Sequence, residues 1–139
     1  MTNESAAATA RPILTSISAQ LFVEDIKASI DFFTGKLGFV ADFVYGEPPF
    51  YGQVSRDNAR LSLRHMEEPV FAGDVREREH LLSATVTLDS AEGIRELFAT
   101  YQAAGVPFHQ MLRTEPWDAL TFVVRDLDGN LLLFAGPAD

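Results

Sequence analysis

The sequence gives the same order of elements twice, and this internal repeat limits the folds open to the chain. Residues 17–63 read as a strand, an acidic break, a helix and further strands, and residues 83–134 repeat that order. A unit of this length that occurs only twice indicates two fused modules, because a solenoid needs about three or more repeats to bury its faces. Paired modules of this kind normally share a groove.

The helix of each module is identified by an apolar stripe with helical spacing. Gly38 follows the first helix and Gly105 the second, and each glycine can adopt the left-handed conformation that ends a helix. Asp89 and Glu92 have the spacing of a capping box, so we expect the second helix to begin there. The stripes predict core residues and comprise Ile26, Ile30, Phe33 and Leu37, followed by Ile94, Leu97, Phe98 and Tyr101.

Alternation along the first strand of each module predicts which side chains face the helices. The other face of each strand is polar but uncharged, which suits a groove. Short turns at residues 56–59 and 126–130 then predict a terminal hairpin in each module. In the first module, Ile17, Ala19, Leu21 and Val23 are expected to face the helices, and Ser18, Gln20 and Phe22 the other side. In the second module, Ala84, Val86 and Leu88 are expected to face the helices, and Ser83, Thr85 and Thr87 the other side.

Composition excludes several classes of function. The 139 residues suit one domain with a real core, since 47% are apolar and 11 are Phe. The absence of cysteine excludes disulfides and thiolate metal sites, and it favours a cytoplasmic location. A net charge of −9 argues against nucleic acid and would favour a cationic ligand, although solubility is the simpler interpretation. No apolar run is long enough to span a membrane, and residues 1–10 lack the features of a signal peptide.

Several motifs are similar to those of the vicinal oxygen chelate superfamily, which contains glyoxalases, extradiol dioxygenases, fosfomycin-resistance enzymes and bleomycin-resistance proteins. The resemblance implies an α+β fold of two βαβββ modules, with mixed sheets curled around a groove that a homodimer commonly completes. It covers one domain, residues 13–136, with module 1 at 13–70, module 2 at 80–136 and a flexible tail at 1–12. The motifs are Val23-Glu24-Asp25-Ile26, Ser29-Ile30-Asp31-Phe32-Phe33, Leu37-Gly38-Phe39, Ala103-Ala104-Gly105-Val106, Pro116-Trp117 and Arg125-Asp126-Leu127-Asp128-Gly129-Asn130-Leu131.

The same resemblance implies that this chain binds no metal. Members that use a metal hold it with His, Glu or Gln at four places, which correspond here to Ser18, Ser62, Ser83 and Leu133. Serine hydroxyls bind divalent metals poorly and leucine cannot bind them. We therefore expect neither a metal nor another cofactor.

The histidines offer little support for catalysis. His80 follows the charged run at 74–79, which reads as an exposed linker between modules. His109 is expected on a strand. His65 is expected near a strand end, where alternation turns its side chain towards the helix. Neither has a second histidine at the spacing of a pair of metal ligands. The chain also lacks a G-x-S-x-G elbow, a phosphate-binding glycine loop and any cysteine nucleophile.

Aromatic residues beside carboxylates give the best indication of a ligand site. Rings grip flat or cationic ligands by stacking and cation–π attraction, and the Pro116-Trp117 element resembles one that lies in the groove of bleomycin-resistance-like members. For Phe50 and Tyr51, the alternative to a ligand contact is that the rings pack within a hairpin. The predicted ligand-binding residues are Trp117, Phe50, Tyr51, Phe22, Gln20, Arg64, His65 and Asp118.

Three functions remain open at this point. The first is a metal-free homodimeric protein that sequesters a small aromatic or cationic molecule, such as an antibiotic of the bleomycin kind. The second is a divergent lyase or isomerase that uses Gln20, Arg64 or His65, and the third is an accessory protein with a vestigial groove. An open aromatic cleft between subunits would favour the first, a deep cavity with a cluster of polar groups the second and a filled cleft the third.

Overall fold

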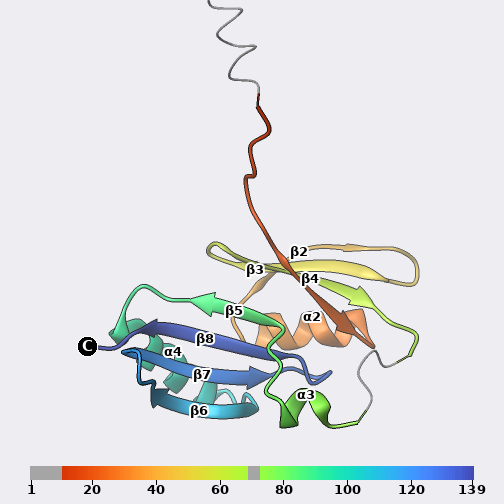
Figure 1. Ribbon diagram of the computed structural model, residues 1–139. Helices are drawn as coiled ribbons and strands as arrows, with labels where there is room; N and C mark the ends of the chain where they lie inside the picture. Colours follow the sequence, from red (N-terminus) through yellow and green to blue (C-terminus); the bar gives the residue numbers. More distant parts are fainter. Residues whose placement is uncertain (1–10, 69–72) are drawn as a thin grey trace, which may run out of the picture.

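The computed structural model describes residues 11–68 and 73–139 (Figure 1). The flexible tail predicted at 1–12 lies mostly outside these residues. No helix in the described part of the chain is long and apolar enough to cross a membrane.

The two modules have the predicted order of elements. Module 1 contains β1 (Ala19–Val23), α2 (Ile26–Gly35), β2 (Val40–Tyr45), β3 (Tyr51–Arg56) and β4 (Ala59–His65). The short helix α3 (Val75–Arg78) lies in the connection. Module 2 contains β5 (Ala84–Thr87), α4 (Ala91–Ala103), β6 (Phe108–Thr114), β7 (Ala119–Arg125) and β8 (Leu131–Pro137).

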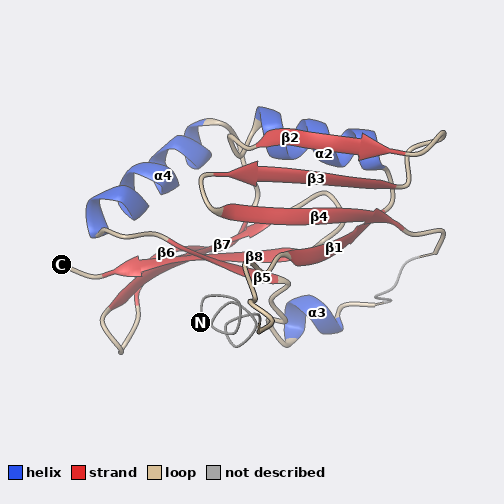
Figure 2. Cartoon of the chain, turned by 90° about the horizontal axis from the view of Figure 1, so that it is seen from above, coloured by secondary structure: helices blue, strands red, loops and turns tan. Residues whose placement is uncertain are grey.

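Each module forms its own four-stranded mixed sheet, in the orders β1-β4-β3-β2 and β5-β8-β7-β6. The first and last strands of each module run parallel, and the remaining pairs are antiparallel. The strands β2 and β6 each lie at one edge of their sheet. Figure 2 shows α2 behind the first sheet, and no helix of the described residues lies over the opposite face of that sheet.

The core forms where the helices meet the sheets. Alternate residues of β1, β3 and β4 are buried on the side of α2, and the corresponding residues of β7 and β8 pack beneath α4. Apolar burial of this kind supplies the main stabilisation of the fold. The helix stripes predicted from spacing are confirmed as core: Ile26, Phe33, Leu37, Ile94 and Tyr101 are buried, while Ile30, Leu97 and Phe98 pack against them.

Side chains cap the first turn of both long helices, and one of the predicted caps is wrong by one residue. Asp25 caps α2 by accepting a hydrogen bond from the Ala28 backbone N–H (3.0 Å). The cap of α4 is Ser90, whose hydroxyl accepts from the Gly93 backbone N–H (2.9 Å), so the predicted box opening at Asp89 is wrong by one residue. Gly105 has φ +75°, which lets the Val106 N–H return to the Tyr101 carbonyl and end the helix.

The prediction that Ile17 faces a helix is wrong. Its side chain is 94% exposed, because β1 begins only at Ala19. Parallel pairing with β4 starts at Ala19 and Leu61, close to the turn that precedes β4. Residues before Ala19 therefore have no neighbouring strand to hold them on the sheet.

Two sets of contacts join the modules. The Tyr101 hydroxyl of α4 donates to the Leu37 carbonyl (2.7 Å), which follows α2. At the β7–β8 turn, the Asn130 side chain donates to the Phe22 carbonyl (3.2 Å), and Asp128 accepts from the Glu24 backbone N–H (2.9 Å). The turn of module 2 is thus fixed against the end of β1.

Candidate functional site

The uncovered face of the first sheet carries two rows of side chains. Residues opposite one another on neighbouring strands share a face, so the strand register gives the rows directly. One row crosses the sheet as Gln20, Ser62, Gln53 and Phe43, and the next as Phe22, Arg64, Tyr51 and Tyr45. We call these eight residues the module 1 face.

Aromatic rings dominate one end of the module 1 face. Tyr45 is 66% exposed and Phe50 is 51% exposed, and their rings meet edge to face with centroids 5.7 Å apart. The ring of Tyr51 lies 5.9 Å from that of Phe43. The rings at 50 and 51 therefore do pack within the hairpin, while Tyr45 and Phe50 still leave apolar surface open to solvent. Exposed apolar patches of this kind mark interaction sites.

A small cleft borders the module 1 face beside Phe22. It has a volume of about 160 Å³ and lies where β1 approaches the connection to module 2 and the start of β8. Its lining combines a ring and two leucines with polar groups: Gln20, Phe22, Arg76, Leu81, Leu82, Ser83 and Asn130. Two predicted ligand residues, Gln20 and Phe22, therefore share one concave site.

The four positions that hold a metal in other members of the resembled superfamily offer no donor set here. Ser62 is buried beside Gln20, and the Ser83 hydroxyl is used in a bond to the Asn130 side chain (3.2 Å). Leu133 pairs with Thr85 in the sheet, and Ser18 lines a different cleft. Within residues 11–68 and 73–139, no group of three or more histidine or acidic side chains could hold a metal ion.

The purified protein should therefore contain no stoichiometric divalent metal. Hydroxyl and aliphatic side chains at the four positions cannot retain such an ion through dialysis. Elemental analysis of dialysed protein measures this directly. One equivalent of zinc, nickel, manganese or iron per chain, lost on mutation of Ser62 or Ser83, would contradict the expectation.

His65 is held in the structure by contacts at the end of the sheet. Alternation along β4 places it on the face opposite to Arg64, as expected from parity. Its Nδ1 lies 2.8 Å from the Glu24 carbonyl, and its Nε2 lies 3.3 Å from Glu67. These contacts tie β4 to the start of α2, so His65 does not join Gln20 and Arg64 on the module 1 face.

Trp117 and Asp118 occupy the tip of the β6–β7 hairpin. The Trp117 side chain is 70% exposed, and Asp118 has φ +62°, a turn conformation. Figures 1 and 2 show this hairpin at the end of the molecule near the C-terminus, whereas the β2–β3 hairpin lies at the opposite end. Within one chain, these two residues are therefore not brought next to Phe50 and Tyr51.

Glu115, unlike Asp118, is not an exposed charge at this tip. It is buried and accepts hydrogen bonds from the Thr121 hydroxyl (2.9 Å) and from Arg113 Nε (3.1 Å). Its carboxylate thus stabilises the base of the hairpin. Of the two acids beside Trp117, only Asp118 is exposed and able to meet a ligand.

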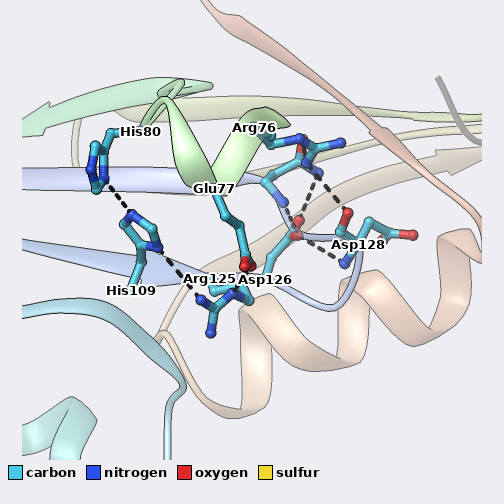
Figure 3. A network of polar contacts seen from close by, with 8 residues as sticks. Arg76, Glu77, His80, His109, Arg125, Asp126 and Asp128 are labelled. Atoms are coloured by element: carbon cyan, nitrogen blue, oxygen red, sulfur yellow. Dashed lines mark hydrogen bonds and ion pairs between the residues drawn. The ribbon is translucent and has the colours of Figure 1, made fainter. Parts of the chain in front are cut away.

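A polar network along the connection was not foreseen from the sequence (Figure 3). His80 Nδ1 lies 2.9 Å from His109 Nε2, and Arg125 Nε donates to Glu77 (2.6 Å). Burial, followed by the positive charges of His80 and Arg125, lowers the pKa of His109. The two histidines are 29 residues apart, so only the fold brings them together. The charged run also contains the helix α3 with buried Arg76, rather than an entirely exposed linker.

A larger cleft of about 820 Å³ lies between the β3–β4 turn and the start of α4. None of the eight predicted ligand residues lines it. The two terminal turns differ here. The β7–β8 turn is hydrogen-bonded to module 1, while no hydrogen bond among the described residues joins Asp57 or Asn58 to module 2. The walls of the cleft combine apolar and charged side chains, including Leu61, Leu97 and Asp89.

Comparisons with solved structures show the same fold in several proteins. TioX from Micromonospora sp. ML1 is 22% identical, with 88% of this chain and 98% of that chain covered and a TM-score of 0.67. The bleomycin-binding protein from bleomycin-producing Streptomyces verticillus, complexed with copper(II)-bleomycin, is 19% identical, with coverage of 93% and 99% and a TM-score of 0.66.

A glyoxalase/bleomycin resistance protein/dioxygenase from Alicyclobacillus acidocaldarius is 17% identical, with coverage of 90% and 92% and a TM-score of 0.70. No curated protein matches the sequence with comparable significance. At these identities the structural likeness establishes the fold alone. The family model of the Glyoxalase/Bleomycin resistance protein/Dioxygenase superfamily, however, matches residues 15–134. The chain therefore belongs to the Glyoxalase/Bleomycin resistance protein/Dioxygenase superfamily.

Proposed function

We propose that this chain is a metal-independent protein that binds a small molecule with a planar aromatic part. The observation that carries the proposal is the module 1 face, where exposed rings surround polar groups and no metal-ligand set is present among the described residues. The exposed rings of Phe43, Tyr45 and Phe50 support sequestration over a vestigial role. The fold shared with a protein solved in complex with copper(II)-bleomycin supports an antibiotic of that kind as one candidate.

Charge suggests where a cationic part of the ligand would lie. Asp118 is exposed beside Trp117, and the chain carries a net charge of −9. A cation is attracted both to the face of an indole ring and to a nearby carboxylate. The tip of the β6–β7 hairpin is therefore the proposed contact for a cationic group.

A divergent enzyme is less well supported by the geometry. Of the three residues considered for catalysis, Gln20 and Arg64 lie on the module 1 face, while His65 bonds the Glu24 carbonyl from the other side of the sheet. A general base must reach the proton that it removes. Without His65, the module 1 face offers an amide, a guanidinium and hydroxyl groups, which suit binding better than proton transfer.

Titration with metal-free bleomycin and with planar aromatic dyes tests the binding role. Calorimetry should show saturable binding with about one site per chain, and Tyr51→Ala should weaken it by about 1–2 kcal/mol, as expected for loss of one stacked ring. Leu127 is an exposed apolar residue of the β7–β8 turn and lines neither cleft, so Leu127→Ala provides the control. Saturable binding that is unchanged by Tyr51→Ala would place the ligand elsewhere, for example in the larger cleft.

We also propose that the protein is a homodimer. The aromatic rings at 50 and 51 and the Trp117 tip lie at opposite ends of one chain, so a second copy is needed to bring them into one groove. The edge strand β2 is exposed at all six positions, and such edges are usually covered. Light scattering at micromolar concentration should give about twice the 15.3 kDa of one chain. A mass of one chain would rule out a shared groove.

A further inference from the structure

Arg64 lies in the second row of the module 1 face, which also contains the rings of Phe22, Tyr51 and Tyr45. Its strand neighbours in register are Phe22 on β1 and Tyr51 on β3, so its side chain emerges between two rings. The residue is exposed, and the small cleft beside Phe22 begins one strand away. A ligand ring that contacts Phe22 and Tyr51 would therefore meet the guanidinium.

Arg64 also differs from the other arginines of the folded chain. Seven of the nine arginines have partners among the described residues: Arg56, Arg60, Arg76, Arg78, Arg95, Arg113 and Arg125. Arg11 precedes the first strand. Within residues 19–68 and 73–139, Arg64 is thus the only arginine that makes no hydrogen bond or ion pair, in a protein with 20 acidic residues.

Two acidic side chains of the surrounding segments have other partners. Asp42, on the edge strand β2, accepts hydrogen bonds from the Gln53 side chain (2.9 Å) and from the Ser55 hydroxyl (2.9 Å). Glu67, beyond the end of β4, contacts His65 at 3.3 Å. The guanidinium of Arg64 therefore stands beside the half-buried rings of Phe22 and Tyr51, with no acidic partner among the described residues.

We propose that Arg64 binds an acidic group, such as a carboxylate or sulfonate, on an aromatic ligand whose ring contacts Phe22 and Tyr51. The planar guanidinium presents paired N–H donors that match two oxygens of such a group. This inference rests on the proposed binding function and specifies its ligand: an aromatic acid at this face, even though the net charge of the chain favours cations. A ligand that also carries a cationic part can satisfy both ends of the proposed groove.

Two fluorescent dyes of opposite charge test this assignment. The anionic probe is 8-anilinonaphthalene-1-sulfonate and the cationic probe is thioflavin T, each titrated into the wild-type protein and its variants. Arg64→Gln should weaken binding of the anionic dye about tenfold, as expected for loss of a charged hydrogen bond at an exposed site. Arg64→Glu should weaken it further and strengthen binding of the cationic dye. Arg60→Gln removes the same charge from the same strand outside the row, and it should change the affinity less than twofold.

Competition separates an aromatic acid from a simple anion. We expect 2-naphthoate to displace the anionic dye and inorganic phosphate at the same concentration to leave it bound, because only the first can contact the rings. Two results would overturn the assignment. One is an equal loss of affinity for the anionic dye in Arg64→Gln and Arg60→Gln, and the other is displacement of that dye by phosphate as complete as by 2-naphthoate.

The outcomes also distinguish this inference from the proposed function. If Tyr51→Ala weakens binding of the cationic dye, while binding of the anionic dye is unchanged in Arg64→Gln, the face binds aromatic ligands and only the role of Arg64 is wrong. If neither dye depends on Tyr51, the proposed binding function fails and the assignment of Arg64 fails with it.

Discussion

Replacing Tyr101 by Ala should lower the free energy of unfolding by about 3–5 kcal/mol, the loss typical of a large buried ring. Tyr101 is 1% exposed, and its ring packs against Phe122 and Phe134 with centroids 6.1 and 5.6 Å away. Its hydroxyl also reaches the Leu37 carbonyl in the other module. The substitution therefore opens a cavity and removes a link between the modules. Urea unfolding followed by circular dichroism measures the change.

Tyr101→Phe is the matched control, since it keeps the ring and removes only the hydroxyl. The Leu37 carbonyl retains a hydrogen bond from Arg56 (2.9 Å), so we expect a loss of about 1 kcal/mol. Burial raises the pKa of Tyr101 from 10.0 to about 12. Because the folded-state pKa is the higher one, this group's contribution is full below pH 10.0 and is lost as the pH rises towards about 12. That component should be absent in Tyr101→Phe. Equal losses for the Ala and Phe variants would contradict the packing role.

Trp117→Ala should weaken ligand binding by about 1–3 kcal/mol, the range found for loss of one stacked ring. The Trp117 side chain is 70% exposed at a hairpin tip and belongs to neither core, so stability should change by less than about 0.5 kcal/mol. Because the chain contains one Trp, quenching of its fluorescence by the ligand reports on this site alone. Calorimetry and fluorescence titration give the affinity.

Two controls define the surroundings of Trp117. Trp117→Phe should recover part of the affinity by restoring a ring. Asp118→Asn should reduce ligand affinity less than Trp117→Ala does. Its effect should decrease at high salt, because exposed charges are screened over about 10 Å at 0.1 M. Should Trp117→Ala unfold the protein, or leave the affinity unchanged for a ligand whose binding depends on Tyr51, the residue has a structural role only.

The fold could be predicted from the sequence because its signals are local and appear twice. The stripe containing Ile94 and Tyr101 specifies a helix, and alternation around Leu21 assigns the buried face of β1. The boundary errors have local causes. Ser90 competes with Asp89 as the helix cap, and Ile17 lies beyond the strand that could pair with it.

The arrangement of the site could not be predicted in the same way, because it depends on contacts between distant segments. Alternation placed Phe22 and Gln20 on the open face, and the register then added Arg64 and Tyr51. No local pattern indicates that the hairpin carrying Trp117 lies at the opposite end of the molecule from the β2–β3 hairpin. Nor does it reveal which arginine lacks a partner, since that depends on where each acidic side chain finally lies.

Metal-independent binding is tested most directly by one titration in two buffers. Wild-type protein is dialysed against EDTA and titrated with 8-anilinonaphthalene-1-sulfonate, then titrated again after addition of one equivalent of zinc, with Tyr51→Ala measured in parallel. We expect the same dissociation constant in both buffers and weaker binding by Tyr51→Ala in each, because the contacts are made by side chains of the module 1 face. Binding that disappears in EDTA and returns with zinc would contradict a metal-independent site.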